Sequence, residues 1–183
     1  MGGHADKNLF AGTHGSRRFE SSPARAGELV ESRPIQNPQP ASSLKEHIED
    51  FDGVARDGIK GCHKKCNFEE AVDSLGGRIE GTEPLESIDG VEQVTYRLPK
   101  KDKTGKPTSE MRAQTFKKTV YDSSVISTEE YVSRGLEAAA DAARKSTSGM
   151  IGHEWTGTDS HGVSWHGYTD ADGSVTSFYP IDE

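Results

Sequence analysis

Cysteine is scarce in this chain of 183 residues, which contains only Cys62 and Cys66. Two cysteines cannot build the disulfide framework that holds many small secreted domains together. Long hydrophobic runs are also missing, since no stretch approaches the roughly 18 apolar residues of a membrane-spanning helix. The N-terminal MGGHADKNLF lacks the apolar core of a signal peptide. The chain is therefore expected to be cytosolic, or a piece of a longer protein whose export signal lies elsewhere.

Apolar residues make up 31% of the chain and charged residues 28%. This supports one hydrophobic core but is low for a tightly packed globule, so a poorly ordered segment is expected. Residues 1–40 fit that expectation, because they lack sustained periodicity and RPIQNPQP holds three prolines. We interpret residues 1–40 as a linker or the end of an upstream region, and residues 41–183 as the folded domain.

The net charge of −8 argues against a general nucleic-acid coat protein, which would be basic overall. One segment has the opposite charge. Residues 97–118 hold eight basic and two acidic residues, a net charge of +6. An RNA-acting protein with a local basic patch therefore stays possible.

The order of predicted elements indicates an α+β fold with antiparallel sheet. Helices are predicted over residues 44–55, over residues 68–75 after an Asn67 cap, and over residues 128–145 after a Ser127–Glu130 capping box. The last helix has an apolar face made of small residues. Strands are predicted over residues 78–81, 91–98 and 111–122, and three more strands follow the last helix. Alternation in the C-terminal strands makes His153, His161 and His166 surface residues.

Two histidines flank the segment between the first two helices. His47 lies at the edge of the Leu44 and Ile48 stripe, and His63 lies in a glycine-rich loop that approaches a helix N-terminus, where free N–H groups suit phosphate. Imidazole titrates near neutral pH, so the pair could supply a general acid and a general base. The simpler alternatives are a packed core-edge histidine at 47 and a solvent-exposed loop histidine at 63.

Residues 91–98 and 111–122 predict a β-hairpin with a long basic tip. Its lysines serve either solubility and edge protection or contact with RNA phosphates. Lys118 differs, because period-2 alternation places it on the face of Phe116 and Val120, and an inward lysine needs a partner or a function. The candidate RNA-contacting residues are Arg97, Lys100, Lys101, Lys103 and Lys106.

The CHKKC segment leaves three further hypotheses open. Cys62, His63 and Cys66 could bind zinc with a fourth ligand such as His153 or His161, although the spacing matches no strong zinc signature. Cys62 and Cys66 could form a disulfide in an exported protein. Cys62 could also be a nucleophile with His47 as its base.

The residue types also fit metal-independent RNA cleavage. One imidazole would take the proton of the ribose 2′-hydroxyl, the other would protonate the departing 5′ oxygen, and a lysine would stabilise the phosphorane. The product would carry a 2′,3′-cyclic phosphate. His47, His63 and Lys118 could supply these three groups.

Four segments, in this order, resemble bacterial EndoU-type RNase toxin domains: HIEDFDG, GIKGCHKK, KKTVYDSSVISTEEYV and SVTSFYP. Such domains are C-terminal modules of contact-dependent growth inhibition and related polymorphic toxin systems. The resemblance covers residues 43–183 and implies an RNase A/EndoU-like fold, with an upstream translocation or pretoxin region before residue 41. It implies that His47, His63 and Lys118 are catalytic and that Thr176 and Tyr179 bind the nucleotide.

The resemblance also implies a setting for that activity. The module would be delivered from a cell-surface or secreted protein into a rival bacterium, where it would cleave RNA, with tRNA the expected substrate. A cognate immunity protein would neutralise it, residues 97–112 would contact tRNA, and no cofactor or metal would be needed.

The sequence departs from the family pattern in three places, one of which is the hairpin over residues 97–112, which is longer than in compact members. Cys62 stands where the family commonly has a glycine, and Thr176 and Tyr179 are three apart, so a β-bulge or strand end is needed to place both in one site. The alternative function, from another class, is a non-catalytic RNA- or protein-binding module that uses the basic hairpin.

Overall fold

The computed structural model describes residues 34–182, so most of the predicted linker and Glu183 lie outside the described residues. This part of the chain has three helices, α1 (Leu44–Glu49), α2 (Lys65–Ser74) and α3 (Thr128–Lys145). The first five strands are β1 (Phe51–Ala55), β2 (Gly58–Gly61), β3 (Arg78–Pro84), β4 (Val91–Arg97) and β5 (Pro99–Lys101). The others are β6 (Pro107–Met111), β7 (Phe116–Tyr121), β8 (Glu154–Thr158), β9 (Ser164–Thr169) and β10 (Val175–Ile181).

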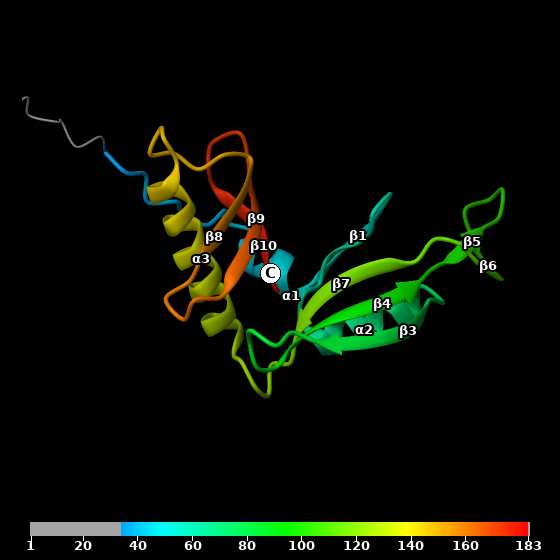
Figure 1. Cartoon of the computed structure of the whole chain (residues 1–183). Coiled ribbons are helices and arrows are strands. Elements are labelled where there is room, and N and C mark those ends of the chain that lie inside the picture. Colours follow the sequence, from blue (N-terminus) through cyan, green and yellow to red (C-terminus); the bar gives the residue numbers. More distant parts are fainter. Residues whose placement is uncertain (1–33, 183) are drawn as a thin grey trace, which may run out of the picture. The chain divides into compact units, whose positions relative to one another are not determined.

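All the strands pair antiparallel, which confirms the predicted α+β class (Figure 1). Strands β3, β4 and β7 form one sheet, here called the central sheet, and β10, β9 and β8 form the C-terminal sheet. Two hairpins, β1–β2 and β5–β6, complete the strands. Helix α3 contacts the C-terminal sheet, α2 contacts β3 and β7, and α1 contacts β2 and β10.

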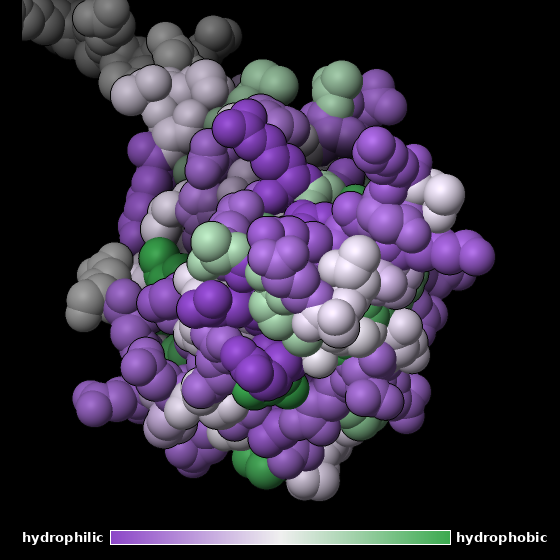
Figure 2. All heavy atoms as spheres, turned by 90° about the vertical axis from the view of Figure 1, so that its right-hand side faces the viewer, coloured by the Kyte–Doolittle hydropathy of each residue, from purple (hydrophilic) through white to green (hydrophobic). Residues whose placement is uncertain are grey.

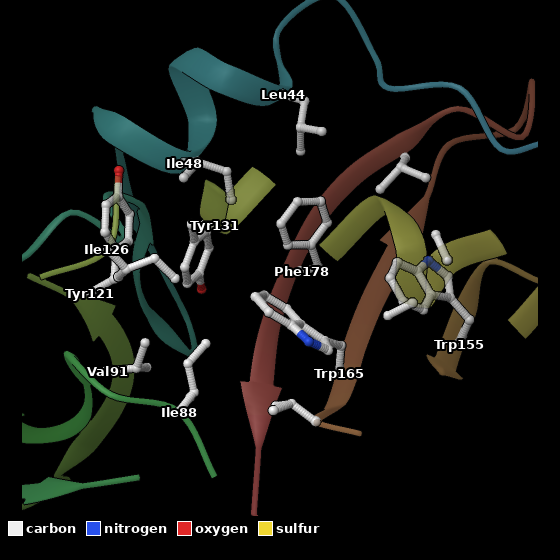
Figure 3. Close-up of a cluster of buried hydrophobic side chains, with 14 of the residues drawn as sticks. Leu44, Ile48, Ile88, Val91, Tyr121, Ile126, Tyr131, Trp155, Trp165 and Phe178 are labelled. Carbon is white, nitrogen blue, oxygen red and sulfur yellow. The ribbon is translucent and has the colours of Figure 1, made fainter. Parts of the chain in front are cut away.

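Aromatic side chains join the two sheets (Figure 3). The ring of Tyr121 in β7 stacks on that of Tyr131 in α3, with 4.4 Å between centroids. Tyr131 also meets Trp165 of β9 at 5.1 Å, and Trp165 meets Phe178 of β10 at 5.6 Å. All four side chains are fully buried. Aromatic pairs contribute about 0.5–1.5 kcal/mol each beyond their area burial, so this cluster fixes one sheet against the other.

A second buried cluster lies between the central sheet and α2. It contains Val94, Tyr96 and Leu98, each at most 3% exposed, which confirms their predicted alternation onto one face. Phe68 of α2 packs edge-on against Tyr96 at 5.1 Å. The buried hydroxyl of Tyr96 accepts a hydrogen bond from the backbone N–H of Ile59 in β2 at 2.7 Å. The cluster therefore also anchors the β1–β2 hairpin.

Helix α3 has the predicted bounds, because Ser127 caps it and its hydroxyl accepts a hydrogen bond from the Glu130 N–H at 3.1 Å. Its small residues let it pack closely on the C-terminal sheet, as predicted. Ala138 is fully buried, and a Cβ built on Gly157 of β8 would lie 1.9 Å from the Ala138 carbonyl oxygen. Larger residues at this contact would push helix and strand apart.

The first predicted helix, over residues 44–55, is too long. Helix α1 ends at Glu49, and residues 51–55 form β1. Phe51 is 44% exposed, so it is not part of the buried stripe of Leu44 and Ile48. Gly53 has a φ of +114°, which no helix accommodates. Pairing with β2 replaces the helical hydrogen bonds that these residues would otherwise make.

Two other predicted boundaries shift. Helix α2 begins at Lys65, so Asn67 does not cap it; the Asn67 amide instead donates to the Glu49 carbonyl at 2.8 Å and ties α2 to the end of α1. The strand predicted over residues 111–122 is divided into β6 and β7. Strand β7 pairs with β4, and β6 pairs with β5, so the predicted hairpin exists with an interruption.

Residues 36–41 bond directly to the domain. The Ala41 N–H donates to the Val175 carbonyl and the Val175 N–H donates to the Gln39 carbonyl, both at 2.8 Å, beside a parallel bridge between Pro40 and Val175. The end of the segment that we assigned to the linker thus extends the edge of β10. No helix within residues 34–182 is long and apolar enough to cross a membrane.

Candidate active site

A cavity of about 820 Å³ is lined by residues of the β1–β2 hairpin, the central sheet and the C-terminal sheet. Its lining includes the five side chains that the sequence selected, which come from α1, the loop after β2, β7 and β10: His47, His63, Lys118, Thr176 and Tyr179. The fold therefore brings together residues up to 132 positions apart in the sequence. A second, smaller cavity of about 290 Å³ contains none of these five side chains.

Backbone hydrogen bonds between α1 and the loop after β2 set the distance between the two histidines. The Cys62 N–H donates to the His47 carbonyl at 2.9 Å, and the His63 and Lys64 N–H groups donate to the Ile48 carbonyl at 2.6 and 3.2 Å. These bonds satisfy carbonyl groups at the end of α1 that have no partner within the helix. The ring centroids of His47 and His63 are 6.1 Å apart. Because these loop N–H groups are occupied, they do not provide the free phosphate-binding amides that we predicted beside His63.

His47 lies between a carboxylate and a hydroxyl. Its Nδ1 hydrogen-bonds the Asp52 carboxylate, and its Nε2 lies 3.1 Å from the Ser177 Oγ. A β-bulge in β1, between Phe51 and Gly53, leaves Asp52 outside the regular pairing and aims it at His47. Asp52 fixes the ring orientation, leaves Nε2 toward the cavity, and provides a counter-charge when the ring carries a second proton.

Close packing around His47 also requires a glycine at position 61. A Cβ on Gly61 would lie 2.7 Å from the His47 carbonyl oxygen and 2.9 Å from the Asp52 Oδ2. Gly61 also has a φ of +62°, a left-handed conformation that favours glycine. The short strand β2 can therefore approach the His47–Asp52 pair only because Gly61 has no side chain.

His63 is 3% exposed, so it is not the solvent-exposed loop histidine of the simpler hypothesis. Its Nδ1 donates a hydrogen bond to the Thr119 carbonyl of β7 at 2.9 Å. Burial lowers the pKa of His63 well below its ordinary value, and the nearby Lys118 ammonium lowers it further. The ring is thus neutral near pH 7, with Nε2 as a hydrogen-bond acceptor.

Lys118 lies on β7, two residues from Phe116 and Val120, which are both buried. Its Nζ donates to the Ile59 carbonyl of β2 at 3.3 Å. Burial lowers the pKa of Lys118 to about 8, against smaller opposing effects of Cys62, Asp57 and Asp52. The predicted inward lysine is therefore partly buried, largely protonated at neutral pH and held beside the histidines in one cavity.

A β-bulge in β10 resolves the spacing of Thr176 and Tyr179. The register shifts between Val175 and Ser177, so Thr176 is the extra residue and both Thr176 and Tyr179 line the cavity. The Tyr179 ring is nearly parallel to that of His63, with 6.3 Å between centroids. Burial, aided by Tyr168, raises the pKa of Tyr179 to about 12, so its hydroxyl stays protonated.

Several cavity residues were not identified from the sequence. Asp52 was hidden because we placed it in a helix, although it lies only five residues after His47. Ser177 is adjacent to Thr176, but only the bulge turns it toward His47. His153 and Tyr168 also line the cavity, and His166 packs 5.5 Å from Tyr179. His153 and His161 are exposed, as predicted, whereas His166 is half-buried. The outward face of their sheet forms one wall of the cavity.

The basic hairpin tip lies outside the cavity lining. Residues 101–110 are all exposed, and the face of the molecule that presents this side is largely hydrophilic (Figure 2). Two of the candidate RNA-contacting residues are paired: Arg97 with Glu80 at 3.0 Å, and Lys100 with Glu110. Lys101, Lys103 and Lys106 make no ion pair within residues 34–182, so their ammonium groups are available to pair with the phosphates of a partner.

Both cysteines are free in the structure, Cys62 buried and Cys66 exposed. Burial raises the pKa of the Cys62 thiol to about 11, which leaves almost no thiolate for nucleophilic attack at neutral pH. Within residues 34–182, no cluster of three or more metal-ligating side chains is present. Cys62 has a φ of +60°, the left-handed region in which a glycine is unstrained.

Cys62→Gly is expected to preserve both folding and any activity of the site. Relief of the left-handed backbone stabilises by about 1–2 kcal/mol, and the lost thiol packing and greater flexibility of glycine cost a similar amount. Thermal unfolding should show a melting temperature close to that of the wild type. A cysteine hydrolase would instead lose all activity with this substitution.

The comparisons with known proteins give two relatives. The chain is 31% identical over 141 residues to "tRNA nuclease CdiA" of Escherichia coli, and 30% identical over 137 residues to "tRNA nuclease CdiA" of Yersinia mollaretii. Each match covers 74% of this chain but only 4% of the relative. The chain thus spans a small part of the length of the curated relatives that it matches. No family model matches it.

Proposed function

We propose that this chain is an endoribonuclease toxin module that cleaves RNA, with tRNA as its substrate, by EndoU-like acid–base transesterification without a metal. The observation that carries the proposal is the convergence of His47, His63 and Lys118 on one cavity. Two relatives whose names describe a tRNA nuclease support the substrate class. Residues 41–183 would be the catalytic domain, and residues 1–40 would lead from an upstream region of a longer protein.

His63 is the general base in this proposal. Its lowered pKa keeps the ring neutral, and the Nδ1–H bond to the Thr119 carbonyl leaves the Nε2 lone pair for the ribose 2′-hydroxyl. As His63 takes that proton, the 2′ oxygen attacks phosphorus. His47 is the general acid: with Asp52 as counter-charge on Nδ1, its protonated Nε2 gives a proton to the 5′ oxygen as the P–O bond breaks. The products are a 2′,3′-cyclic phosphate and a 5′-hydroxyl.

Lys118 stabilises the additional negative charge of the phosphorane. A partly buried ammonium acts more strongly on that charge than one in water, because the local dielectric is lower. Its hydrogen bond to the Ile59 carbonyl holds it in place before substrate arrives. Thr176 and Tyr179 would bind the nucleotide from the β10 wall.

The proposed setting is contact-dependent inhibition between bacteria. The module would arrive in a target cell as part of a longer secreted or surface-displayed protein, and a cognate immunity protein would protect the producer. Incubation of purified tRNA with the protein in excess EDTA tests the activity directly, since a binding module would leave the tRNA intact.

The pH dependence of kcat/KM should be bell-shaped, with an unusually low acid limb. The base His63 must be neutral, and its lowered pKa keeps it neutral well below the ordinary range of histidine. On the alkaline side, activity requires both the protonated His47 as general acid and the Lys118 ammonium, so it should fall at the latest through about pH 8, where Lys118 loses its charge. Initial rates on a short RNA, measured from about pH 4 to about pH 10, cover both limbs of the profile. An acid limb at the ordinary histidine pKa would contradict the assignment of His63 as base.

The basic hairpin tip is proposed as a secondary contact for the tRNA backbone. Replacing Lys101, Lys103 and Lys106 by glutamine should weaken tRNA binding and lower the slope of log affinity against log salt by up to about 0.9 per lost phosphate contact. Cleavage of a short oligonucleotide should be much less affected, because the tip lies outside the cavity. Wild-type tRNA affinity and salt slope in the triple variant would exclude the contact.

A further inference from the structure

A row of aromatic side chains leads from His63 across the outward face of the C-terminal sheet. Tyr179 is nearly parallel to His63, and His166 follows at 5.5 Å from Tyr179. Tyr168 lies 5.1 Å from His166, and His153 lies 6.3 Å from Tyr168. Strand register produces this row, because Tyr179 is opposite His166 and Ser177 is opposite Tyr168 in the β9–β10 pair.

Tyr168 and His153 line the same cavity, yet the proton transfers do not use them. The ring planes of His166 and His153 meet that of Tyr168 at 80° and 60°, so neither ring lies flat on it. The Tyr168 ring therefore has no stacked partner among the described residues. His153 Nδ1 donates to the Thr169 carbonyl at 2.6 Å, so Nε2 is the ring nitrogen that this bond leaves for a ligand.

The facing side of the cavity is basic. Lys60 of β2 and Lys117 of β7 line it, are exposed, and make no ion pair within residues 34–182. The lining has two acidic residues: Asp52, which is already bonded to His47, and Asp57, which stands against the three lysines Lys60, Lys117 and Lys118. Aromatic rings on one side and free ammonium groups on the other match single-stranded nucleic acid, whose bases stack on rings while its phosphates meet lysines.

We propose that Tyr168 and His153 form a subsite for a second nucleobase, that of the nucleotide next to the cleaved one. In this arrangement Tyr168 stacks on the base, the His153 Nε2 accepts a hydrogen bond from its edge, and Lys60 and Lys117 contact the backbone phosphates. The inference rests on the proposed RNA cleavage and adds to it that the cavity selects a single-stranded segment of at least two nucleotides.

The test compares two substrates: a single-stranded tetranucleotide, and a nucleoside 3′-aryl phosphate that has no neighbouring base. Tyr168→Ala should lower the ratio of kcat/KM for the tetranucleotide to that for the aryl phosphate by about five- to a hundredfold, the usual effect of losing one base–aromatic stack. The loss should lie mainly in KM. His153→Ala should lower the same ratio by a smaller factor.

Tyr168→Phe distinguishes stacking from an indirect role. It keeps the ring but removes the hydroxyl that hydrogen-bonds Tyr179, so a stacking subsite predicts a ratio close to wild type. If Phe lowers the ratio as much as Ala, Tyr168 acts by positioning Tyr179 and the subsite is wrong. An unchanged ratio in Tyr168→Ala would also overturn it. His161→Ala, which removes an exposed ring outside the cavity lining, is the matched control.

A binding measurement separates this inference from the proposed reaction. A 2′-deoxy tetranucleotide lacks the attacking hydroxyl, so its Kd reports the subsite without cleavage. Tyr168→Ala should raise that Kd by the same five- to hundredfold, in line with about one lost stack. If the wild type binds this probe tightly but cleaves no RNA, the proposed function fails and the subsite stands. If Tyr168→Ala and wild type bind it equally, the subsite fails whatever the activity.

Discussion

His63→Ala should lower the rate of RNA cleavage about 10²–10⁴-fold, the range that a positioned general base contributes. His63 is buried, carries a lowered pKa and is held by the Thr119 carbonyl. No other described imidazole shares these three features. Single-turnover rates on a short RNA, with protein in excess, measure the effect on the chemical step alone.

His63→Asn is the matched control for folding. Alanine leaves the buried Thr119 carbonyl without its partner, at a cost of about 1–3 kcal/mol, whereas an asparagine amide can replace the Nδ1–H donor. Both variants should be inactive, and the asparagine variant should be the more stable of the two. Substantial cleavage by a folded His63→Asn protein would exclude His63 as the base.

Lys118→Met should lower kcat about 10²–10³-fold, the usual consequence of removing one group that stabilises transition-state charge. Folding should survive, because methionine fills a similar volume and removes a charge whose burial is costly. Binding of a 2′-deoxy oligonucleotide should change far less than kcat, since the charge that Lys118 meets develops only during the reaction. Initial rates and Kd measured side by side separate the two effects.

Lys145→Met is the matched control for charge removal. Lys145 is an exposed residue at the end of α3 that pairs with Asp141, away from the cavity lining. Lys145→Met should therefore cleave RNA at the wild-type rate. Equal losses in kcat and in binding for Lys118→Met would instead make Lys118 a ground-state phosphate contact.

Local signals in the sequence predicted part of the fold. The Ser127–Glu130 capping box and the small-residue face gave the bounds of α3, because both act within a few residues. Alternation likewise identified the buried face of β4. The first helix was predicted too long because residues 51–55 form their backbone hydrogen bonds with β2. The spacing of Leu44, Ile48 and Phe51 fits a helix and does not show this strand pairing.

The candidate site follows the same division. The residue types of His47, His63 and Lys118 suggested acid–base chemistry, and the resemblance added Thr176 and Tyr179. All five residues line one cavity. Their supporting groups could not be predicted from spacing. Asp52 and Ser177 reach His47 only because β1 and β10 each contain a bulge, and a bulge depends on strand pairing rather than on local sequence.

At position 62 the sequence departs from the domains that it resembles, and the backbone geometry shows why a glycine suits this position. Gly61 and Cys62 both have left-handed φ values, +62° and +60°, directly before His63. Two such residues turn the chain so that the His63 N–H meets the Ile48 carbonyl. A glycine is therefore the unstrained residue at position 62, and the cysteine here offsets its strain by full burial of its side chain.

Analysis of the RNA ends produced in excess EDTA tests the central claim most directly. The wild-type protein is incubated with purified tRNA, and the fragments are examined for 2′,3′-cyclic phosphate and 5′-hydroxyl ends. The His47/His63/Lys118 mechanism predicts cleavage that EDTA does not reduce, with cyclic phosphates on the new 3′ ends. Cleavage that stops in EDTA and returns with Mg²⁺, or fragments with 3′-hydroxyl and 5′-phosphate ends, would contradict it.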